Sequence, residues 1–215
     1  MVITIGGSFG CGGKAIAAKA AELLGYRLCN DEIITEAVKD SPFDMKEETF
    51  RYFDESQGSA PLSELAHLSD VQRTGYVEEA VRSLSFDVVP LDRAMAEIQS
   101  SVMNRLADEG NCILLGRCAD HFLAGRDDVL SVFVIDEEEN CIDRLKEYYP
   151  EMSEREIKKL IKKTDKRRED YYCFFTNKRW GDAANYGMIL NLALLGGAEN
   201  AAVLLAGAVK ARENA

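Results

Sequence analysis

The first 24 residues constrain the fold of this chain more than any other segment. The apolar run 2–5 leads into a glycine-rich turn over residues 6–13, and helix-forming residues follow as far as Leu24. A short strand, a glycine-rich turn and a helix in this order are typical of a phosphate-binding loop. Glycines let backbone N–H groups turn inward around an anion, and the helix N-terminus adds partial positive charge. The segment therefore predicts a protein that handles phosphoryl groups.

The turn departs from the usual pattern G-x-x-x-x-G-K-[ST]. Counted from Gly7, the second glycine is Gly12 but the lysine position holds Gly13; counted back from Lys14, the first glycine position holds Ser8. A tight glycine turn without a ligand is the alternative interpretation. We expect Lys14 to reach the phosphate oxygens, although Ala15 replaces the hydroxyl residue that usually ligates Mg²⁺. The predicted nucleotide-binding residues are Ser8, Phe9, Gly10, Cys11, Gly12, Gly13, Lys14 and Ala15.

Length and composition exclude several classes of protein. A chain of 215 residues, 47% of them hydrophobic, fits one α/β domain with a sizeable core. No apolar run approaches the length of a membrane span, and Met1 leads directly into a strand, so we expect no signal peptide, no membrane partner and a cytoplasmic protein. The six cysteines form no C-x-x-C pair and the two histidines have no evident partner, so no metal site is expected.

Charge is distributed unevenly along the chain. The net charge of −11 disfavours nucleic-acid binding. Residues 154–179 nevertheless hold ten of the 26 Lys and Arg residues against five acids. Such a run is usually a solvated helix face. Beside a phosphate loop, it could instead supply the cations that close around a triphosphate.

Hydrophobic patterning predicts a doubly wound sheet. Five apolar segments, at residues 2–6, 26–29, 112–115, 129–135 and 186–192, alternate with helical segments at 13–24, 32–39, 91–108, 137–148, 153–170 and 198–212. Strands buried on both faces and separated by helices indicate a parallel sheet, whose ligands lie beyond the strand carboxyl ends. Asn30, Asp31, Arg117 and Asp136 fall at such ends. The amphipathic 91–108 helix could bury its apolar face in the core or in a homodimer.

Three segments together resemble the cytidylate-kinase-like family of P-loop proteins. They are the N-terminal loop, the central Leu115-Gly116-Arg117-Cys118-Ala119-Asp120, and a C-terminal set. That set comprises Asp165-Lys166-Arg167-Arg168, Tyr171-Tyr172, Thr176, Trp180-Gly181-Asp182, Asn185-Tyr186 and Asn191. The resemblance implies a single P-loop NTPase-type kinase domain over residues 1–215, with a five-stranded parallel sheet and helices on both faces. The core would be residues 1–40, 105–150 and 183–215, the helical monophosphate-binding insertion 41–104, and the basic lid 151–182.

The same resemblance implies an activity and roles for residues. The activity is phosphoryl transfer from ATP to a small-molecule acceptor, with a CMP- or dCMP-like nucleoside monophosphate as the expected acceptor and Mg²⁺ held mainly by phosphates and water. Gly10, Gly12 and Gly13 would form the phosphate loop, Arg117 would bind the acceptor phosphate, and Arg167 and Arg168 would neutralise the transferring group together with Lys14. Asn30, Asp31 and Asp120 would line the acceptor side.

The chain departs from the family at the acceptor side and ahead of the glycine loop. At the acceptor side Cys118 replaces an aspartate and Asn30 replaces an acid; ahead of the loop, Gly6-Gly7 replace a serine and an arginine. Two other functions therefore stay open. One is a nucleotide-binding regulatory protein without turnover, and the other is a kinase of a non-nucleotide small molecule.

Overall fold

The computed structural model describes residues 1–41 and 91–214. The chain divides into two compact units, one comprising Met1–Asn30 with Met103–Ala215 and the other Asp31–Val102. The second unit contains helix α2 (Asp31–Asp40) and the first part of helix α6 (Leu91–Asp108). Most of the predicted insertion at 41–104 lies outside the described residues, so the proposed subdivision of a single domain stays a prediction.

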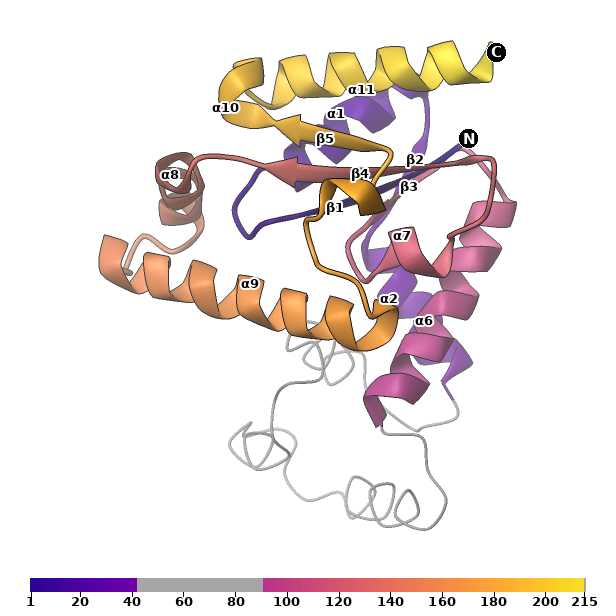
Figure 1. The fold of residues 1–215 in the computed structure, drawn as a ribbon, viewed down its shortest axis with the longest axis horizontal. Coiled ribbons are helices and arrows are strands. Elements are labelled where there is room, and N and C mark those ends of the chain that lie inside the picture. The colour runs from indigo at the N-terminus through magenta and orange to yellow at the C-terminus, as the bar shows by residue number, and fades with distance from the viewer. Residues whose placement is uncertain (42–90, 215) are drawn as a thin grey trace. The chain divides into compact units, whose positions relative to one another are not determined.

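A five-stranded parallel sheet forms the centre of the larger unit (Figure 1). Its strand order is β2-β3-β1-β4-β5, so that β1 lies between two strands that come much later in the chain. In the register of the sheet, Ile3 is paired with both Ile113 and Leu130. The strands are β1 (Val2–Gly7), β2 (Arg27–Cys29), β3 (Cys112–Leu115), β4 (Val129–Ile135) and β5 (Met188–Asn191). The predicted α/β class and parallel sheet are confirmed.

The sheet is buried on both faces because its strands are continuously apolar. Ile3, Ile113 and Val134 are completely buried. Figure 1 shows α1 and α11 on one side of the sheet, and α7 and α9 on the other. The helices of this unit, besides the end of α6, are α1 (Gly13–Leu24), α7 (Ala119–Phe122), α8 (Glu138–Tyr148), α9 (Glu154–Thr176), α10 (Leu192–Leu195) and α11 (Ala198–Glu213), with a 3-10 turn at Ala183–Asn185.

Local sequence signals fix several helix ends. Gly25 ends α1 in the left-handed conformation, with φ of 69°. At the start of α9, the Ser153 N–H donates to Glu156 Oε2 at 2.8 Å, and the Glu156 N–H donates to Ser153 Oγ at 3.4 Å. This is the capping box that the sequence predicts.

Two element boundaries differ from the prediction. Helix α9 continues to Thr176 rather than about residue 170, because Tyr172 on its last turns is 3% exposed and anchors them in the core. Strand β5 ends at Asn191, because the Asn191 side chain accepts a hydrogen bond from the Leu194 N–H at 3.3 Å and starts α10. In the described residues, no helix is both long enough and apolar enough to cross a membrane.

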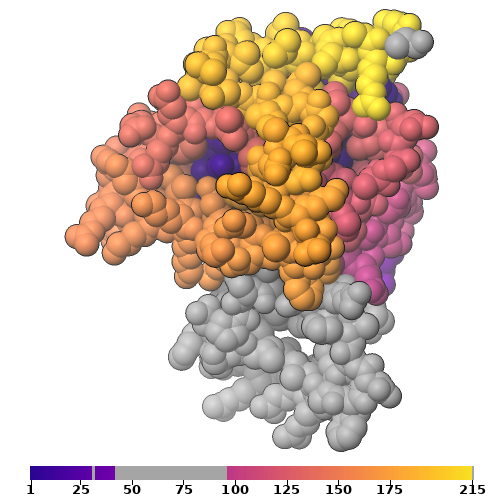
Figure 2. Space-filling view, in the orientation of Figure 1, coloured from indigo at the N-terminus to yellow at the C-terminus, as the bar shows by residue number. Residues whose placement is uncertain are grey.

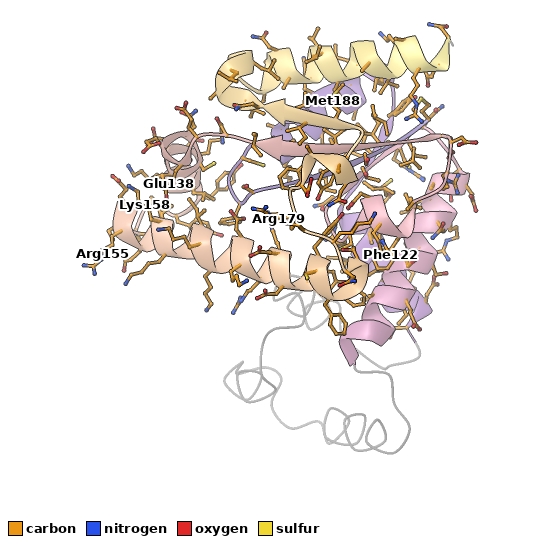
Figure 3. All side chains as sticks on the ribbon, in the orientation of Figure 1. Phe122, Glu138, Arg155, Lys158, Arg179 and Met188 are labelled. Carbon is orange, nitrogen blue, oxygen red and sulfur yellow. The ribbon has the colours of Figure 1, made fainter. Side chains whose placement is uncertain are left out.

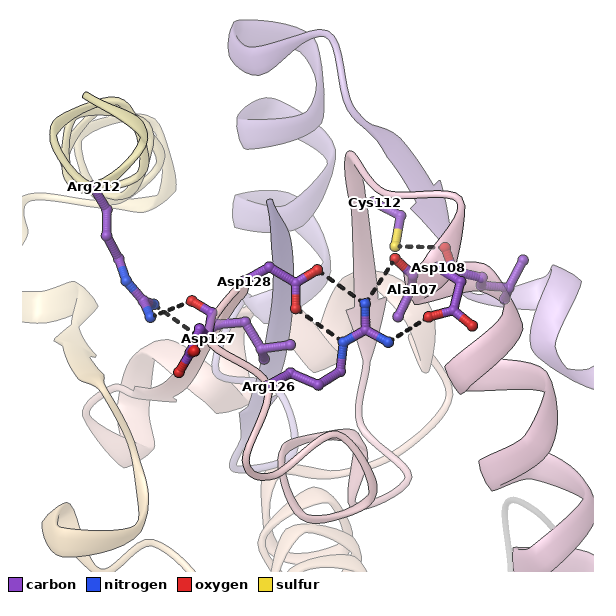
Figure 4. A network of polar contacts seen from close by, with 9 residues as sticks. Ala107, Asp108, Cys112, Arg126, Asp127, Asp128 and Arg212 are labelled. Carbon is purple, nitrogen blue, oxygen red and sulfur yellow. Dashed lines mark hydrogen bonds and ion pairs between the residues drawn. The ribbon is translucent and has the colours of Figure 1, made fainter. Parts of the chain in front are cut away.

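Arg126 joins the amino end of β4 to the end of α6 (Figure 4). Its guanidinium donates to both Asp128 carboxylate oxygens at 2.9 Å and to Asp108 Oδ1 at 2.6 Å. Nearby, Arg212 of α11 donates to the carbonyl oxygens of Asp127 and Val129 at 2.9 and 2.7 Å. These contacts lie at the amino ends of the strands. The glycine loop lies at the opposite end of the sheet, because it follows the carboxyl end of β1.

Candidate functional site

The glycine loop between β1 and α1 has a shape that only glycine permits at two positions. A Cβ on Gly7 would lie 2.5 Å from the Val134 carbonyl oxygen and 2.8 Å from Cys11 Sγ. Gly12 has a φ of 85°, and a Cβ there would lie 2.8 Å from Leu192 Cδ2. The glycines therefore allow the loop to pass close to β4 and α10 before it enters α1.

Some backbone N–H groups of the loop donate hydrogen bonds to other protein groups, and others donate to no described group. Ser8 N donates to Val134 O at 3.3 Å, Cys11 N donates to Ser8 O at 3.1 Å, and Phe9 N donates to Asp165 Oδ1 at 2.7 Å. In contrast, no described protein group accepts a hydrogen bond from the N–H groups of Gly10, Gly12, Lys14 or Ala15. Two of these belong to the first turn of α1, where the helix dipole is positive. This arrangement is suited to binding an anion.

Arg144 of α8 places a guanidinium against this loop. It donates to the Gly10 carbonyl oxygen and forms an ion pair with Asp136, which directly follows β4. The Asp136 side chain is 0% exposed and also accepts from Asn140 Nδ2 at 2.9 Å. Burial by itself raises the pKa of Asp136, but the hydrogen bonds from Asn140, Arg144 and the Glu137 N–H outweigh it, so the pKa lies below its usual value. Asp136 thus acts as a charged anchor for Arg144.

Sequence reasoning missed Arg144 entirely. The residue stands eight positions after the strand-end Asp136, on a helix that contains charged residues at several other positions. Nothing in its spacing distinguishes it from a solvated arginine. The available signal was Asp136 itself, an acid at the carboxyl end of a buried strand, since such a group needs a cationic or polar partner when its side chain is enclosed.

Two residues of α9 form hydrogen bonds with the backbone of the loop. Asp165 accepts the Phe9 N–H, and Arg168 Nη1 donates to the Gly7 carbonyl oxygen at 2.9 Å. The Arg168 guanidinium also lies 5.4 Å from the centroid of the Phe9 ring, within cation–π range. The structure therefore brings predicted Arg168 to the predicted loop, together with Asp165, which the sequence had not marked as a site residue.

Lys14 and Arg167, unlike Arg168, are not seen to bind the loop with their side chains. Lys14 is exposed near the start of α1, and Arg167 is partly exposed on α9. Among the described residues, the side chains of Lys14 and Arg167 make no hydrogen bond with the loop and form no ion pair. Their predicted roles in charge neutralisation stay predictions.

The remaining basic residues of the 154–179 segment lie mainly on the outer surface of α9. Arg155 extends away from the fold at the start of the helix, and Lys158 lies beside Glu138 of α8 (Figure 3). Lys158 pairs with Glu154 at 3.1 Å, and Lys166 pairs with Asp170 at 2.9 Å. Most of this charge run is therefore a solvated helix face, and Arg168 is its described member with a contact to the loop.

Cys11 belongs to the loop and is buried, with 4% of the residue exposed. Burial raises the pKa of its thiol to about 11, although the Gly13 N–H and the Arg168 charge act in the opposite direction. The thiol therefore stays protonated at neutral pH and packs as a small apolar side chain rather than acting as a nucleophile.

Arg117 follows β3 in an unusual backbone conformation. Arg117 and Cys118 both have positive φ angles, 55° and 54°, directly after Gly116. Non-glycine residues in this region store about 1 kcal/mol of strain each, which is common at functional sites. Arg117 Nη1 donates to Asn30 Oδ1 at 3.2 Å and to the Leu115 carbonyl oxygen at 3.1 Å. Two predicted acceptor-side residues, Arg117 and Asn30, are thus in direct contact.

Asp120, at the start of α7, is connected to α9 instead of to Arg117. Its Oδ2 accepts the Tyr172 hydroxyl at 2.9 Å, and the Tyr172 ring is stacked with Tyr186 at a centroid distance of 6.4 Å. Burial raises the pKa of the Asp120 carboxyl, with the Tyr172 hydroxyl opposing it. The side chain of Asp31, the remaining predicted acceptor residue, lies outside the described residues.

Part of the N-terminal segment lies at the bottom of a hollow in the molecular surface. Figure 2 shows indigo atoms of the N-terminal segment at the bottom of this hollow, flanked by atoms of the α8 region and of the chain that follows α9. A ligand can therefore approach the N-terminal segment from solvent on this face.

Among the described residues, no group of three or more His, Cys, Asp or Glu side chains could hold a metal ion. Ala15 has no hydroxyl, and Asp136 is engaged by Arg144. Neither the first turn of α1 nor the end of β4 therefore offers the described oxygen ligands of a protein cage for Mg²⁺.

Comparisons with known proteins agree with this geometry. The profile of the cytidylate kinase-like family matches residues 2–193. A search of curated proteins found no match. Among solved structures, an uncharacterized protein from Eubacterium ventriosum is similar over 98% of both chains, with 20% identity and a TM-score of 0.67. Shikimate kinase from Bacteroides thetaiotaomicron is similar over 98% of both chains, with 13% identity and a TM-score of 0.52. At these identities the structural likenesses establish the fold alone.

Proposed function

The chain belongs to the cytidylate kinase-like family, and we propose on that premise that it transfers a phosphoryl group from ATP to a small-molecule acceptor, with a CMP- or dCMP-like monophosphate as the preferred acceptor. The observation that carries the proposal is the set of loop N–H groups, at Gly10, Gly12, Lys14 and Ala15, that donate to no group of the described part of the chain. Backbone donors left without protein partners at a helix N-terminus are the usual cradle for a phosphate.

Cations for the donor phosphates come from outside the loop. Counted from Gly7, the lysine of the loop comes one position late, at Lys14, and Arg144 and Arg168 both contact loop carbonyls, at Gly10 and Gly7. Guanidinium groups suit this role because they donate several hydrogen bonds in a fixed plane to phosphate oxygens. In the proposed complex they bind the phosphates and offset the charge that builds up during transfer.

Arg117 is proposed to orient the acceptor. Its bond to Asn30 fixes the guanidinium between β2 and β3, at the sheet edge where ligands of such folds bind. Mg²⁺, bound through the phosphates, would supply further charge neutralisation. The protein's own part is therefore to position two substrates and to supply donors and cations, which is most of what phosphoryl transfer requires.

A second candidate function is nucleotide binding without turnover. The displaced lysine and the missing Ser/Thr, whose place Ala15 takes, favour it, because the usual loop uses these groups to contact the transferring phosphates and Mg²⁺. A third is phosphorylation of a non-nucleotide acceptor. Cys118 and Asn30 leave that acceptor side less acidic than the family pattern, and a structural relative is a shikimate kinase.

The deciding experiment measures ADP formation from Mg-ATP with CMP, dCMP, UMP, AMP and shikimate as acceptors. The proposal expects turnover with a pyrimidine monophosphate, abolished in Arg117→Ala but retained in Arg126→Ala, a matched arginine at the opposite edge of the sheet. Turnover with shikimate alone would support the non-nucleotide kinase. Tight ATP binding without ADP from any acceptor would support the regulatory function and contradict the kinase.

A further inference from the structure

The loop's phosphate-binding surface already contains one anion, which belongs to the protein. The Asp165 carboxylate accepts the Phe9 N–H at 2.7 Å, and this donor immediately precedes the unoccupied N–H of Gly10. Three residues further along α9, Arg168 donates to the Gly7 carbonyl oxygen at 2.9 Å. One face of α9 therefore satisfies both a donor and an acceptor of the loop backbone.

A carboxylate in this position has the same needs as a phosphate oxygen. Both are anionic acceptors that gain charge-assisted hydrogen bonds from backbone N–H groups. Asp165 also lies close enough to Arg168 for their charges to interact. The carboxylate thus occupies a loop donor and partly offsets the charge of a cation that lies beside the loop.

We propose that Asp165 is an internal competitor for the phosphate site, holding α9 on the loop until a phosphate displaces it. The inference rests on the proposed function in one respect, that the loop binds phosphates. Displacement would release the Phe9 N–H and free Arg168 from the carboxylate. Because Arg168 is only three residues from Asp165, the same movement of α9 would turn its guanidinium from the Gly7 carbonyl oxygen toward the anion.

Electrostatics gives the expected size of the effect. A like charge within a few ångströms of a bound anion, at the partly wet surface of a protein, weakens binding by roughly tenfold or more. Removing the charge while keeping the oxygen acceptor should therefore strengthen phosphate binding. A purely structural carboxylate would behave in the opposite way, since its loss would loosen the loop and weaken binding.

The test compares wild type with Asp165→Asn, which keeps an oxygen that can accept the Phe9 N–H. Asp170→Asn is the matched control, because Asp170 lies on the same helix but pairs with Lys166 at the surface. Calorimetry would measure binding of inorganic pyrophosphate and, separately, of Mg-ATP. We expect Asp165→Asn to bind pyrophosphate about tenfold more tightly, with Asp170→Asn within about twofold of wild type.

Each outcome separates the two proposals. Tighter pyrophosphate binding by Asp165→Asn with no Mg-ATP binding by any variant would support the competitor and contradict the proposed function. Unchanged or weaker pyrophosphate binding by Asp165→Asn, with Mg-ATP bound by wild type, would overturn the competitor and leave the function standing. If no variant, wild type included, bound pyrophosphate or Mg-ATP, both the competitor and the proposed function would be overturned.

A second measurement on wild type avoids any folding defect of the variant. The Phe9 amide resonance in ¹⁵N-labelled protein reports its hydrogen bond to Asp165. Addition of pyrophosphate should shift that resonance as the carboxylate leaves. A Phe9 resonance that stays fixed while the Gly12 and Lys14 resonances shift would show that phosphate binds beside Asp165 without displacing it, and would overturn the inference.

Discussion

Arg144 and Asp136 form an ion pair that holds a guanidinium against the glycine loop. The carboxylate is enclosed at the carboxyl end of β4, and the arginine reaches from α8 to the Gly10 carbonyl oxygen. A cation fixed in this way lies beside the proposed phosphate site, in a loop whose lysine, Lys14, falls one position after the usual one when the motif is counted from Gly7.

Replacing Arg144 should therefore affect both binding and stability. Arg144→Ala removes a charged donor from the phosphate site, so we expect ATP affinity to fall by roughly tenfold to a hundredfold. It also leaves the Asp136 carboxylate without its cation, which should lower the free energy of unfolding by about 3 kcal/mol. Calorimetry and urea denaturation measure the two effects. Lys146→Ala, on the same helix, should leave both ATP affinity and the free energy of unfolding close to those of wild type. Equal losses in the two variants would contradict the role of Arg144 at the phosphate site.

The loop glycines give a matched comparison. Gly7→Ala would force a methyl group to within 2.5 Å of the Val134 carbonyl oxygen, so we expect a loss of about 2 kcal/mol or more in stability and a loss of nucleotide binding. Gly207→Ala on α11 meets nothing within 4 Å and should stabilise the protein by roughly 0.5–1 kcal/mol. Thermal denaturation of both variants checks the prediction, which fails if Gly7→Ala is tolerated.

Arg117 should matter for the acceptor rather than for ATP. Arg117→Lys keeps a charge but cannot preserve the guanidinium geometry at Asn30 and the Leu115 carbonyl oxygen. We expect kcat/KM for the acceptor to fall by at least about tenfold while the Kd for ATP stays within about twofold. Asn30→Ala should produce a smaller loss of the same kind. A parallel loss of ATP affinity in Arg117→Lys would place Arg117 on the donor side.

The raised pKa of Asp120 predicts that the free energy of unfolding depends on pH. Burial raises the pKa of this carboxyl in the folded protein, so the folded state binds its proton more tightly than the unfolded state. Its stabilising contribution is then complete below the unfolded pKa and is lost as pH rises through the folded pKa. Asp120→Asn keeps an acceptor for the Tyr172 hydroxyl but does not titrate. Urea denaturation from about pH 3.5 to about pH 6.5 should show wild type losing stability relative to Asp120→Asn; a constant difference would contradict the prediction.

Much of the fold was predictable because its signals are local. Apolar runs such as 129–135 specify buried strands, Gly25 ends α1, and Ser153 with Glu156 begins α9. The glycine turn between β1 and α1 was predictable because Gly7 and Gly12 are needed there for steric reasons that the sequence pattern reflects, whereas its binding of phosphate stays a prediction. These features depend on a few neighbouring residues, so they can be identified without knowing the tertiary structure.

The partners of the loop could not be predicted in the same way. Arg144 and Asp165 reach it from 134 and 156 residues along the chain. Among several similar charged residues on α8 and α9, these two contact the loop only because of the way the helices pack on the sheet. The basic segment shows the same limit, since Arg168 contacts the loop whereas Lys158 and Lys166 pair with acids at the surface.

The measurement that tests the phosphate cradle most directly is the response of individual loop amides to Mg-ADP in ¹⁵N-labelled protein. We predict large shifts for the N–H groups of Gly10, Gly12, Lys14 and Ala15, with little change at Ser8, whose N–H is bonded to Val134. Shifts confined to residues outside the loop, or none at saturating Mg-ADP, would contradict the assignment of this loop as a phosphate-binding site.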